Sequence, residues 1–315
     1  KSIRIPRPRL YTHEETSMTV QVVRGKRSGV NMFVCATIHG DELNGIEITR
    51  RVIEKLNPER MRGTVIAAPV VNVFGLINHS RYLPDRRDLN RAFPGSTRGS
   101  LASRLAHIVM TEIVQHCTHG IDLHTASNDR TNLPQIRGDL SDSETIRIAE
   151  AFSAPVMMNA STRDGSLREA ATSEGRHVLV YEAGEALRFN DDAIDVGVRG
   201  VLNVMKALNI LRGKRGKQRR SSVHVESLGW VRARQSGFLH LDVGLGRVVS
   251  KREIIGAIQD PFGESRSLVR APRDGIIISY TQSPLVHRGD AVVHLAGARP
   301  SEAIEDKQVV AEEEV

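Results

Sequence analysis

Short apolar runs alternate with amphipathic stretches over the first two thirds of the chain. Residues 30–38 form an apolar run of strand length, and residues 42–56 then show the spacing of apolar positions that is typical of a helix. The same alternation predicts strands at residues 63–70, 120–123 and 177–182, and helices at residues 101–116, 144–152 and 193–208. Strands that alternate with helices predict an α/β fold, in which helices flank a parallel or mixed sheet.

The pattern changes towards the carboxyl end of the chain. Residues 223–296 contain many short apolar runs separated by glycines, and no stretch among them has a helical period. This texture predicts a small all-β domain. We therefore expect a larger domain at residues 1–212, a basic linker at 213–222, the β domain at 223–302 and an acidic tail at 303–315.

The net charge raises the question of a nucleic-acid partner. The chain has 315 residues and a formal net charge of +7. Six basic residues lie within residues 212–220, which leaves a charge of +1 for the rest of the chain. A local basic run beside glycines is typical of a solvated linker, although a phosphate-binding patch has a similar composition. We expect the linker, and hence no nucleic-acid partner.

Composition and cysteine usage are those of a globular protein. Hydrophobic residues make up 40% of the chain and charged residues 26%. No apolar run reaches the roughly 18 residues of a spanning helix, and no long apolar segment follows the basic residues 1–9. Cys35 and Cys117 lie in or beside apolar stretches, which favours buried free thiols over a disulfide. These features predict a cytoplasmic protein with no membrane segment and no secretory signal.

Two histidines stand where predicted strands end. His39 follows the apolar run 30–38, Glu42 comes three residues later at the predicted helix start, and His124 ends a second strand. Two neutral imidazoles and one carboxylate are ligands that a zinc ion accepts in hydrolytic sites, with a position left for water. Because α/β sheets place their ligands at the carboxyl ends of the strands, these residues form a candidate metal site. A single histidine is more often a surface residue or a satisfied core residue than a metal ligand, so the site depends on the two histidines together.

Two further acidic residues lie at the same predicted sheet edge. Glu182 ends a third strand and so joins the two histidines there, with a helix cap or a salt-bridge partner as the alternative. Asp122 lies two residues before His124, and hence on the same face of that strand. It either accepts a hydrogen bond from a ligand imidazole or is a strand-end charge with no metal role.

An arginine-rich segment lies between the two histidines. Residues 81–95 contain four arginines interrupted by Pro, Asn and Gly, which is the pattern of an ordered loop rather than of a helix face. The planar guanidinium of arginine binds a carboxylate through two parallel hydrogen bonds, and asparagine can add a donor. The segment is therefore either a carboxylate-binding loop or a solvated basic loop.

Four motifs, taken together and in this order, resemble the succinylglutamate desuccinylase/aspartoacylase family, which is related to the zinc carboxypeptidases. They are His39-x-x-Glu42, Asp88-Leu89-Asn90-Arg91, Asp122-Leu123-His124 and Glu182-x-Gly184. The resemblance covers roughly residues 32–208, and Asn-Leu-Pro-Gln at residues 132–135 is closest to the bacterial deacylase branch. It implies a mixed sheet flanked by helices, as in the zinc carboxypeptidases.

The resemblance also implies a role for each residue that matches a motif. His39, Glu42 and His124 would bind one zinc ion per chain. Glu182 would be the catalytic residue, because it would activate a water molecule at the metal. The implied reaction is hydrolysis of an amide bond.

The implied substrate is an N-acyl amino acid or a similar small carboxylate, cleaved by a deacylase, desuccinylase or deacetylase. Asn90 and Arg91 would hold its carboxylate, and Arg81 and Arg168 are further candidate substrate-binding residues. Two alternatives remain: a zinc carboxypeptidase, which needs an open cleft for peptides, and a binding protein without turnover. The sequence leaves open the acyl group, the amine and whether the chain forms a homo-oligomer.

The C-terminal β domain has a resemblance of its own. Ala-Pro-Arg-Asp-Gly at residues 271–275 and Val286-x-x-Gly289-Asp290 resemble the barrel-like β fold of biotinyl and lipoyl carrier domains. A carrier needs an acceptor lysine at a hairpin tip, shortly before the Ala-Pro segment. Residues 260–263 occupy that neighbourhood without a lysine, and Lys251 is the only lysine between residues 223 and 300. We therefore expect a cap or assembly domain with no covalent cofactor.

Overall fold

The computed structural model describes residues 1–7, 17–127, 129–160, 163–213, 222–225 and 227–297. The chain divides into two compact units, Lys1–Ser222 and Val223–Val315. Residues 214–221 of the expected basic linker and the whole of the expected acidic tail lie outside the described residues.

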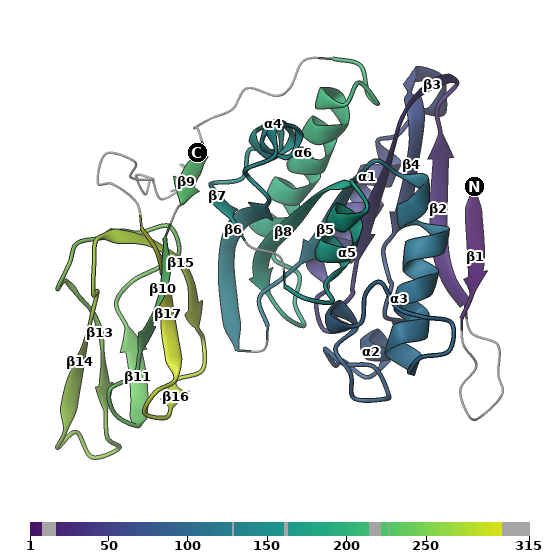
Figure 1. Ribbon diagram of the computed structural model, residues 1–315. Coiled ribbons are helices and arrows are strands. Elements are labelled where there is room, and N and C mark those ends of the chain that lie inside the picture. The colour runs from purple at the N-terminus through teal and green to yellow at the C-terminus, as the bar shows by residue number, and fades with distance from the viewer. Residues whose placement is uncertain (8–16, 128, 161–162, 214–221, 226, 298–315) are drawn as a thin grey trace, which may run out of the picture. The chain divides into compact units, whose positions relative to one another are not determined.

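A mixed sheet runs through the first unit (Figure 1). Its strands are β1 (Ser2–Pro6), β2 (Ser17–Arg24), β3 (Arg27–Ala36), β4 (Arg62–Ala68), β5 (His119–His124), β6 (Arg130–Gly138), β7 (Val156–Asn159) and β8 (His177–Glu185). The order is β1-β2-β4-β3-β5-β8-β6, with β7 beside β6. The central strands β4, β3, β5 and β8 are parallel, whereas β2 and β6 flank them antiparallel. The predicted mixed α/β architecture is thus confirmed.

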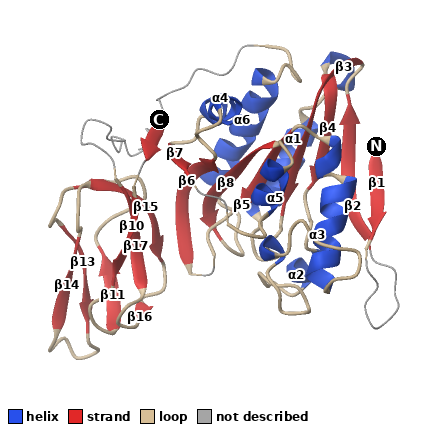
Figure 2. Cartoon of the chain, viewed as in Figure 1, coloured by secondary structure: helices blue, strands red, loops and turns tan. Residues whose placement is uncertain are grey.

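Helices cover both faces of this sheet (Figure 2). The helices of one face are α1 (Asn44–Glu54), α4 (Ser143–Phe152) and α6 (Asp191–Ala207), and those of the other are α2 (Val73–Ile77), α3 (Leu101–Glu112) and α5 (Leu167–Ser173). Along β3, Met32 and Val34 belong to the first core, whereas Phe33 and Cys35 belong to the second. A strand buried on both faces is a nearly continuous apolar run, which is why the pattern of residues 30–38 predicted it.

The observed elements differ from the predicted ones at several ends. Helix α1 begins at Asn44 because residues 39–42 form a turn, in which the Glu42 amide donates to the His39 carbonyl at 3.2 Å. Helix α3 ends at Glu112, and Val114–His116 forms a separate 3-10 turn.

The sequence pattern did not predict β1, β2, β6, β7, α2 or α5. Strand β6 shows why, because its segment Arg-Thr-Asn-Leu-Pro-Gln-Ile-Arg-Gly has neither an apolar run nor a clean alternation. Its register with β8 is irregular between Asn132 and Gln135, around Pro134. Proline cannot donate to a sheet ladder, so a strand that contains one is weakly marked in the sequence.

The second unit contains only strands among its described residues, as predicted. They are β9 (Val223–Val225), β10 (Leu228–Arg232), β11 (Gly237–Leu241), β12 (Val248–Val249), β13 (Ile254–Gln259), β14 (Arg266–Arg270), β15 (Gly275–Thr281), β16 (Leu285–Val286) and β17 (Ala291–Ala296). Strands β10, β17, β15 and β12 pair in that order, and β14, β13, β11 and β16 form a second antiparallel sheet. The two sheets enclose one apolar core, which includes Val231, Ile258 and Leu295.

Both cysteines are buried and free, which confirms the prediction of unpaired thiols. Burial raises the pKa of the Cys117 thiol to about 12. Among the helices formed by the described residues, none is long and apolar enough to cross a membrane.

Candidate active site

Three side chains from two segments meet at the carboxyl ends of the parallel strands. His39 lies in the turn after β3, Glu42 lies just before α1, and His124 is the last residue of β5. Strands β3 and β5 are parallel neighbours, so their carboxyl ends lie side by side. The turn requires Gly40, because a Cβ atom there would lie 1.9 Å from the carbonyl carbon of Gly75 in α2.

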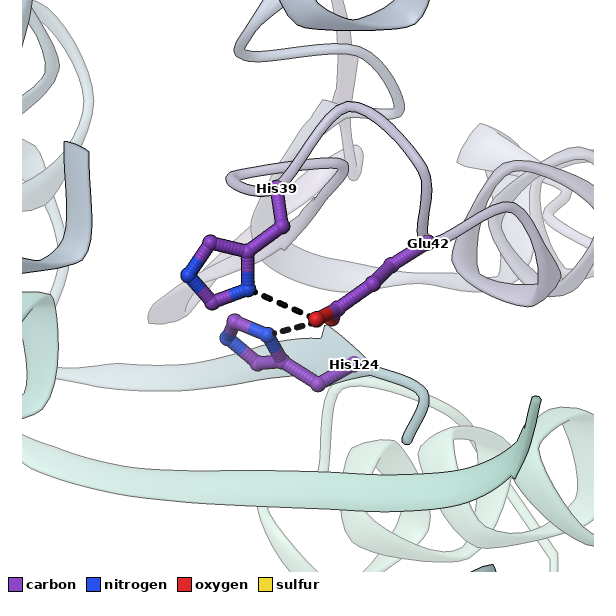
Figure 3. A group of neighbouring side chains, drawn as sticks. All are labelled: His39, Glu42 and His124. Atoms are coloured by element: carbon purple, nitrogen blue, oxygen red, sulfur yellow. Dashed lines mark hydrogen bonds and ion pairs between the residues drawn. The ribbon is translucent and has the colours of Figure 1, made fainter. Parts of the chain in front are cut away.

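Figure 3 shows how these three side chains face one another. The carboxylate of Glu42 lies between the two rings, with Oε1 2.7 Å from His39 Nδ1 and Oε2 2.7 Å from His124 Nδ1. The ring centroids of the histidines are 5.0 Å apart. All three side chains are at most 4% exposed, and their ligand atoms lie within 4.8 Å of one another. The three residues could therefore hold a metal ion.

A carboxylate also contacts the outer nitrogen of each imidazole. His39 Nε2 lies 3.1 Å from Asp88 Oδ1, and His124 Nε2 lies 2.8 Å from Asp122 Oδ2. Such partners fix the ring orientation and favour the tautomer that leaves Nδ1 available to a metal. Of the two readings of Asp122 that the sequence leaves open, the geometry agrees with a hydrogen bond to a candidate ligand imidazole.

The carboxylate and the imidazoles of the cluster shift one another's pKa values towards the charged forms. Burial would raise the pKa of Glu42, yet the two histidines hold it well below its usual range. Burial would lower the pKa of both imidazoles, but Glu42 raises that of His39, and Asp122 with Glu42 raises that of His124 well above its usual value. The cluster thus favours positive charge around a charged carboxylate. Two imidazoles and one carboxylate fit a divalent cation of the zinc type, both in ligand chemistry and in charge.

Arg81 lies against this cluster. Its Nη2 donates to Asp88 Oδ2 at 2.9 Å, and its Nη1 donates to Glu42 Oε1 at 3.4 Å. The Arg81 side chain is 24% exposed and is therefore only partly buried. The arginine predicted to face the substrate therefore borders the candidate metal ligands.

Asn90 and Arg91 lie in a short 3-10 turn, Leu89–Arg91, that Asp88 caps. The side-chain oxygen of Asn90 accepts from the Leu167 amide at 2.9 Å, which ties this turn to the start of α5. Arg91 is exposed, and its Nη1 donates to the Asn90 carbonyl. The exposed guanidinium keeps further donors for a ligand.

Glu182 lies beside His124 in the parallel register of β5 and β8. Its Oε2 accepts from Asn132 Nδ2 at 2.9 Å, and its Oε1 lies 3.5 Å from Arg137 Nη1. The side chain is 19% exposed. Because neighbouring strands project paired residues to the same face, Glu182 and His124 share the face that carries α5.

Arg168 is more buried than the other candidate arginines. It lies in α5, is 7% exposed, and donates from Nη1 to the Ala160 carbonyl at 2.9 Å. It directly follows Leu167, the residue that binds Asn90. The fold thus brings the tip of the arginine-rich loop and the start of α5 together.

Three residues at the site had no role predicted from the sequence: Asp88, Asn132 and Arg137. Asp88 stands inside the Asp-Leu-Asn-Arg motif, and its place there was the available signal. Asn132 and Arg137 reach Glu182 from β6, and because β6 was not predicted, no signal placed them beside it.

Comparison with known proteins identifies the family of the chain. Residues 28–208 match the model of the succinylglutamate desuccinylase/aspartoacylase catalytic domain. The N-alpha-acetyl-L-2,4-diaminobutyric acid deacetylase of Halomonas elongata is 26% identical over 271 residues, which are 82% of this chain and 79% of that protein.

Solved structures resemble the whole chain. The succinylglutamate desuccinylase/aspartoacylase of Rhodobacter sphaeroides has a TM-score of 0.85 and 26% identity, over 95% of this chain and 96% of that one. The product-bound ectoine utilization protein EutE (DoeB) of Ruegeria pomeroyi has a TM-score of 0.84 and 21% identity, over 94% of each chain. Since the family model covers more than half of its residues, this chain belongs to the succinylglutamate desuccinylase/aspartoacylase family.

Proposed function

We propose that the protein is a zinc-dependent hydrolase that cleaves the amide bond of an N-acyl amino acid or a similar small carboxylate. Membership of a family of deacylases supports cleavage of an amide. The observation that carries the proposal is the buried cluster of His39, Glu42 and His124, with Glu182 next to His124 in register.

In this proposal, His39, Glu42 and His124 would hold one zinc ion per chain. A zinc ion bound there would polarise the scissile carbonyl and lower the pKa of a water molecule. Asp88 and Asp122 keep the two rings oriented for this role through the outer nitrogens.

Glu182 is the proposed general base. It takes a proton from the attacking water and passes it to the nitrogen of the leaving amine, so that the carboxylate ends the cycle as it began. Asn132 donates to one oxygen of Glu182 and thereby holds the side chain in position. Arg137 balances its charge from the other side.

Asn90 and Arg91 are the proposed anchors of the substrate carboxylate. The exposed guanidinium of Arg91 offers the paired donors that a carboxylate accepts. Anchoring the substrate at this end orients the amide towards Glu182, which is how binding energy contributes to rate. Arg81, beside Glu42, is proposed to face the acyl end, and Arg168 to support the loop or the substrate from α5.

A substrate screen tests this function. The zinc-loaded protein is incubated with N-acetyl, N-succinyl and N-formyl amino acids, and free amine is measured. N-alpha-acetyl-L-2,4-diaminobutyrate is included because a relative is named for it. We expect release of amine from at least one compound. Peptides are assayed beside these compounds, and release from peptides alone would favour a carboxypeptidase. No release by folded, zinc-loaded protein would contradict the proposal.

A further inference from the structure

Strand β6 carries a row of polar side chains on the face that holds Glu182. Gln135 is the antiparallel partner of Glu182, and Glu182 is in turn the parallel partner of His124. Directly paired residues project to the same face of a sheet, about 4.8 Å apart from strand to strand. Ile136, the next residue of β6, belongs to the core on the opposite face. Gln135 therefore lies one strand beyond the proposed general base.

The side-chain amide of Gln135 lacks a partner. The residue is 0% exposed, and neither Nε2 nor Oε1 has a hydrogen bond within the part of the chain that the structure describes. Buried polar groups are nearly always bonded in folded proteins, because an unpaired one loses its water without compensation. Asn132, three residues before Gln135 and on the other side of the irregularity in β6, does bond to Glu182. A fully buried and unpaired amide at this place indicates a ligand group that completes it.

Arg137 adds a donor to the same row. Its Nη1 lies 3.5 Å from Glu182, while its Nε is buried and has no partner among the described residues. Burial and the charge of Arg137 both lower the pKa of Arg168, so a second guanidinium lies close by. Asp139 and Asp122 act against this lowering, and the pKa of Arg168 is still lowered, so an anion bound near its guanidinium would stabilise the charge further.

The unpaired atoms define the ligand chemistry. Gln135 Nε2 and Arg137 Nε are two donors, which suits the two oxygens of a carboxylate, and Gln135 Oε1 is an acceptor for an N–H group. Both features occur in N-acyl amino acids. The carboxylate can belong either to the amino acid or to a dicarboxylic acyl group such as succinyl.

We propose that Gln135 and Arg137 form a second substrate anchor, which binds a carboxylate other than the one held at Asn90 and Arg91. This proposal rests on the proposed deacylase function. It names the substrate class of that function as N-acylated compounds with two polar groups, one for each anchor. Gln135 is then a residue that determines specificity, because substrates without the second carboxylate leave its amide unpaired.

The first test compares Gln135→Met with the wild type and with the exposed control Gln115→Met. Methionine keeps the length of the side chain but removes both polar atoms. The zinc-loaded full chain is assayed with N-acetyl-L-2,4-diaminobutyrate, N-succinyl-L-2,4-diaminobutyrate and N-succinyl-1,3-diaminopropane, and kcat and KM are determined for each. 1,3-Diaminopropane is 2,4-diaminobutyrate without its carboxylate, and acetyl is succinyl without its terminal carboxymethyl group.

The two sources of the carboxylate give different patterns. If the carboxylate belongs to the acyl group, kcat/KM of Gln135→Met falls about tenfold to a hundredfold for both succinyl compounds, because one charged hydrogen bond is lost. For the acetyl compound, kcat/KM then hardly changes. If it belongs to the amino acid, both diaminobutyrate compounds lose activity and the diaminopropane compound does not. An equal change for all three compounds, or no change, would overturn the proposal.

A second measurement does not depend on turnover. A buried amide without a hydrogen-bond partner does not stabilise the folded protein. The Tm of zinc-loaded Gln135→Met should therefore equal or exceed that of the wild type. Succinate or L-2,4-diaminobutyrate should raise the Tm of the wild type and of Gln115→Met, and the ligand that binds the anchor should fail to do so in Gln135→Met. A Tm lowered by several degrees without ligand would make Gln135 a structural residue and overturn the anchor.

The two proposals fail in separate ways. A zinc-loaded wild type that releases no amine contradicts the deacylase function, whereas an active wild type whose Gln135→Met variant keeps its selectivity and ligand response contradicts only the anchor. The Tm series decides the anchor even if turnover is absent.

Discussion

The carboxylates of Glu42 and Glu182 both lie at the edge of the sheet where the parallel strands end. The two side chains differ in their solvent exposure and in the atoms that they contact. The Glu42 side chain is 2% exposed and lies between two imidazoles, whereas the Glu182 side chain is 19% exposed and contacts an amide and a guanidinium. A carboxylate enclosed by imidazoles is suited to share a metal with them. A carboxylate that reaches solvent is suited to exchange protons with water. The different surroundings therefore suit Glu42 to the proposed role of metal ligand and Glu182 to that of general base.

The metal proposal predicts that His124→Ala loses stoichiometric zinc, because it removes one of three ligands. Asp122→Asn should weaken zinc binding about tenfold to a hundredfold, since it disturbs only the partner of the outer nitrogen. Zinc content after dialysis and competition with a chelator measure both effects. His116→Ala, at an exposed histidine, should keep full zinc. Full occupancy in His124→Ala would remove this ligand set.

Glu182→Gln tests the general base. Glutamine keeps the shape and can still accept from Asn132, but it cannot take a proton. We expect kcat to fall about a hundredfold to ten-thousandfold while zinc stays bound. Glu185→Gln, on the same strand, is the control and should keep its activity. Near-normal kcat in zinc-loaded Glu182→Gln would make Glu182 a structural carboxylate.

Arg91→Lys tests the substrate anchor, because lysine keeps the charge but not the paired donors. The loss should be at most about 1.5–3 kcal/mol of transition-state stabilisation, and it should appear mainly in KM, since the contact forms before the reaction. Steady-state kinetics beside the exposed control Arg98→Lys measure it. An unchanged KM with a lowered kcat would place Arg91 in the chemical step instead.

At the scale of elements, the site depends on the register of three strands. Asp122 pairs with Cys35 on one side and with Val180 on the other, and His124 pairs with Glu182. A slip of one residue would turn every side chain of β5 to the opposite face, and the candidate metal ligand His124 would enter the apolar core. The apolar residues of β5, Ile121 and Leu123, hold this register because they belong to the core on the other face.

The approach of α2 to the His39 turn gives a prediction for Gly40→Ala. The new Cβ would meet three backbone atoms of residues 75 and 76 within 1.9–2.4 Å, so α2 or the turn must move. We expect a loss of about 1–3 kcal/mol in the free energy of unfolding, together with weaker zinc binding. Denaturant unfolding and zinc titration measure these changes. Gly244→Ala, where nothing lies within 4 Å, should leave both unchanged; equal stability of the two variants would contradict the argument.

At the scale of the whole molecule, the residues assigned to catalysis all lie in Lys1–Ser222, and the second unit has its own core between two sheets. A unit with its own core need not take part in the chemistry, and its role remains the predicted one of a cap or assembly domain. The catalytic-domain model likewise ends at residue 208.

The second unit is predicted to carry no covalent cofactor. The intact mass of protein made in a host that attaches biotin and lipoate should equal that of the unmodified chain. Lys251, the only lysine between residues 223 and 300, is exposed in the turn between β12 and β13 and is the residue to examine. A mass increase that matches either group, and that Lys251→Arg abolishes, would show a carrier domain.

The local pattern of apolar and polar residues was sufficient to predict several strands, the candidate site residues at or near their ends, and the family. Apolar runs predicted β3, β5 and β8, because these strands are buried on one or both faces. The polar residues at or near their carboxyl ends, His39, His124 and Glu182, were visible as interruptions, although β8 continues past Glu182 to Glu185. The motifs also identified the family, which the catalytic-domain match confirms. These features are local: each depends on a few consecutive residues.

Only the tertiary structure decided which residues surround Glu182. Strand β6 has a proline and no regular alternation, so its existence depends on pairing with β8 and β7, and pairing between distant segments leaves no local signal. The same pairing places Asn132, Gln135 and Arg137 on the active face and leaves the Gln135 amide buried without a partner. A polar side chain can be exposed to solvent, hydrogen-bonded within the protein, or buried without a hydrogen-bond partner. Which of these it is depends on how the rest of the fold buries it. The sequence alone therefore predicted the candidate metal ligands, but not the wall of the site that faces them.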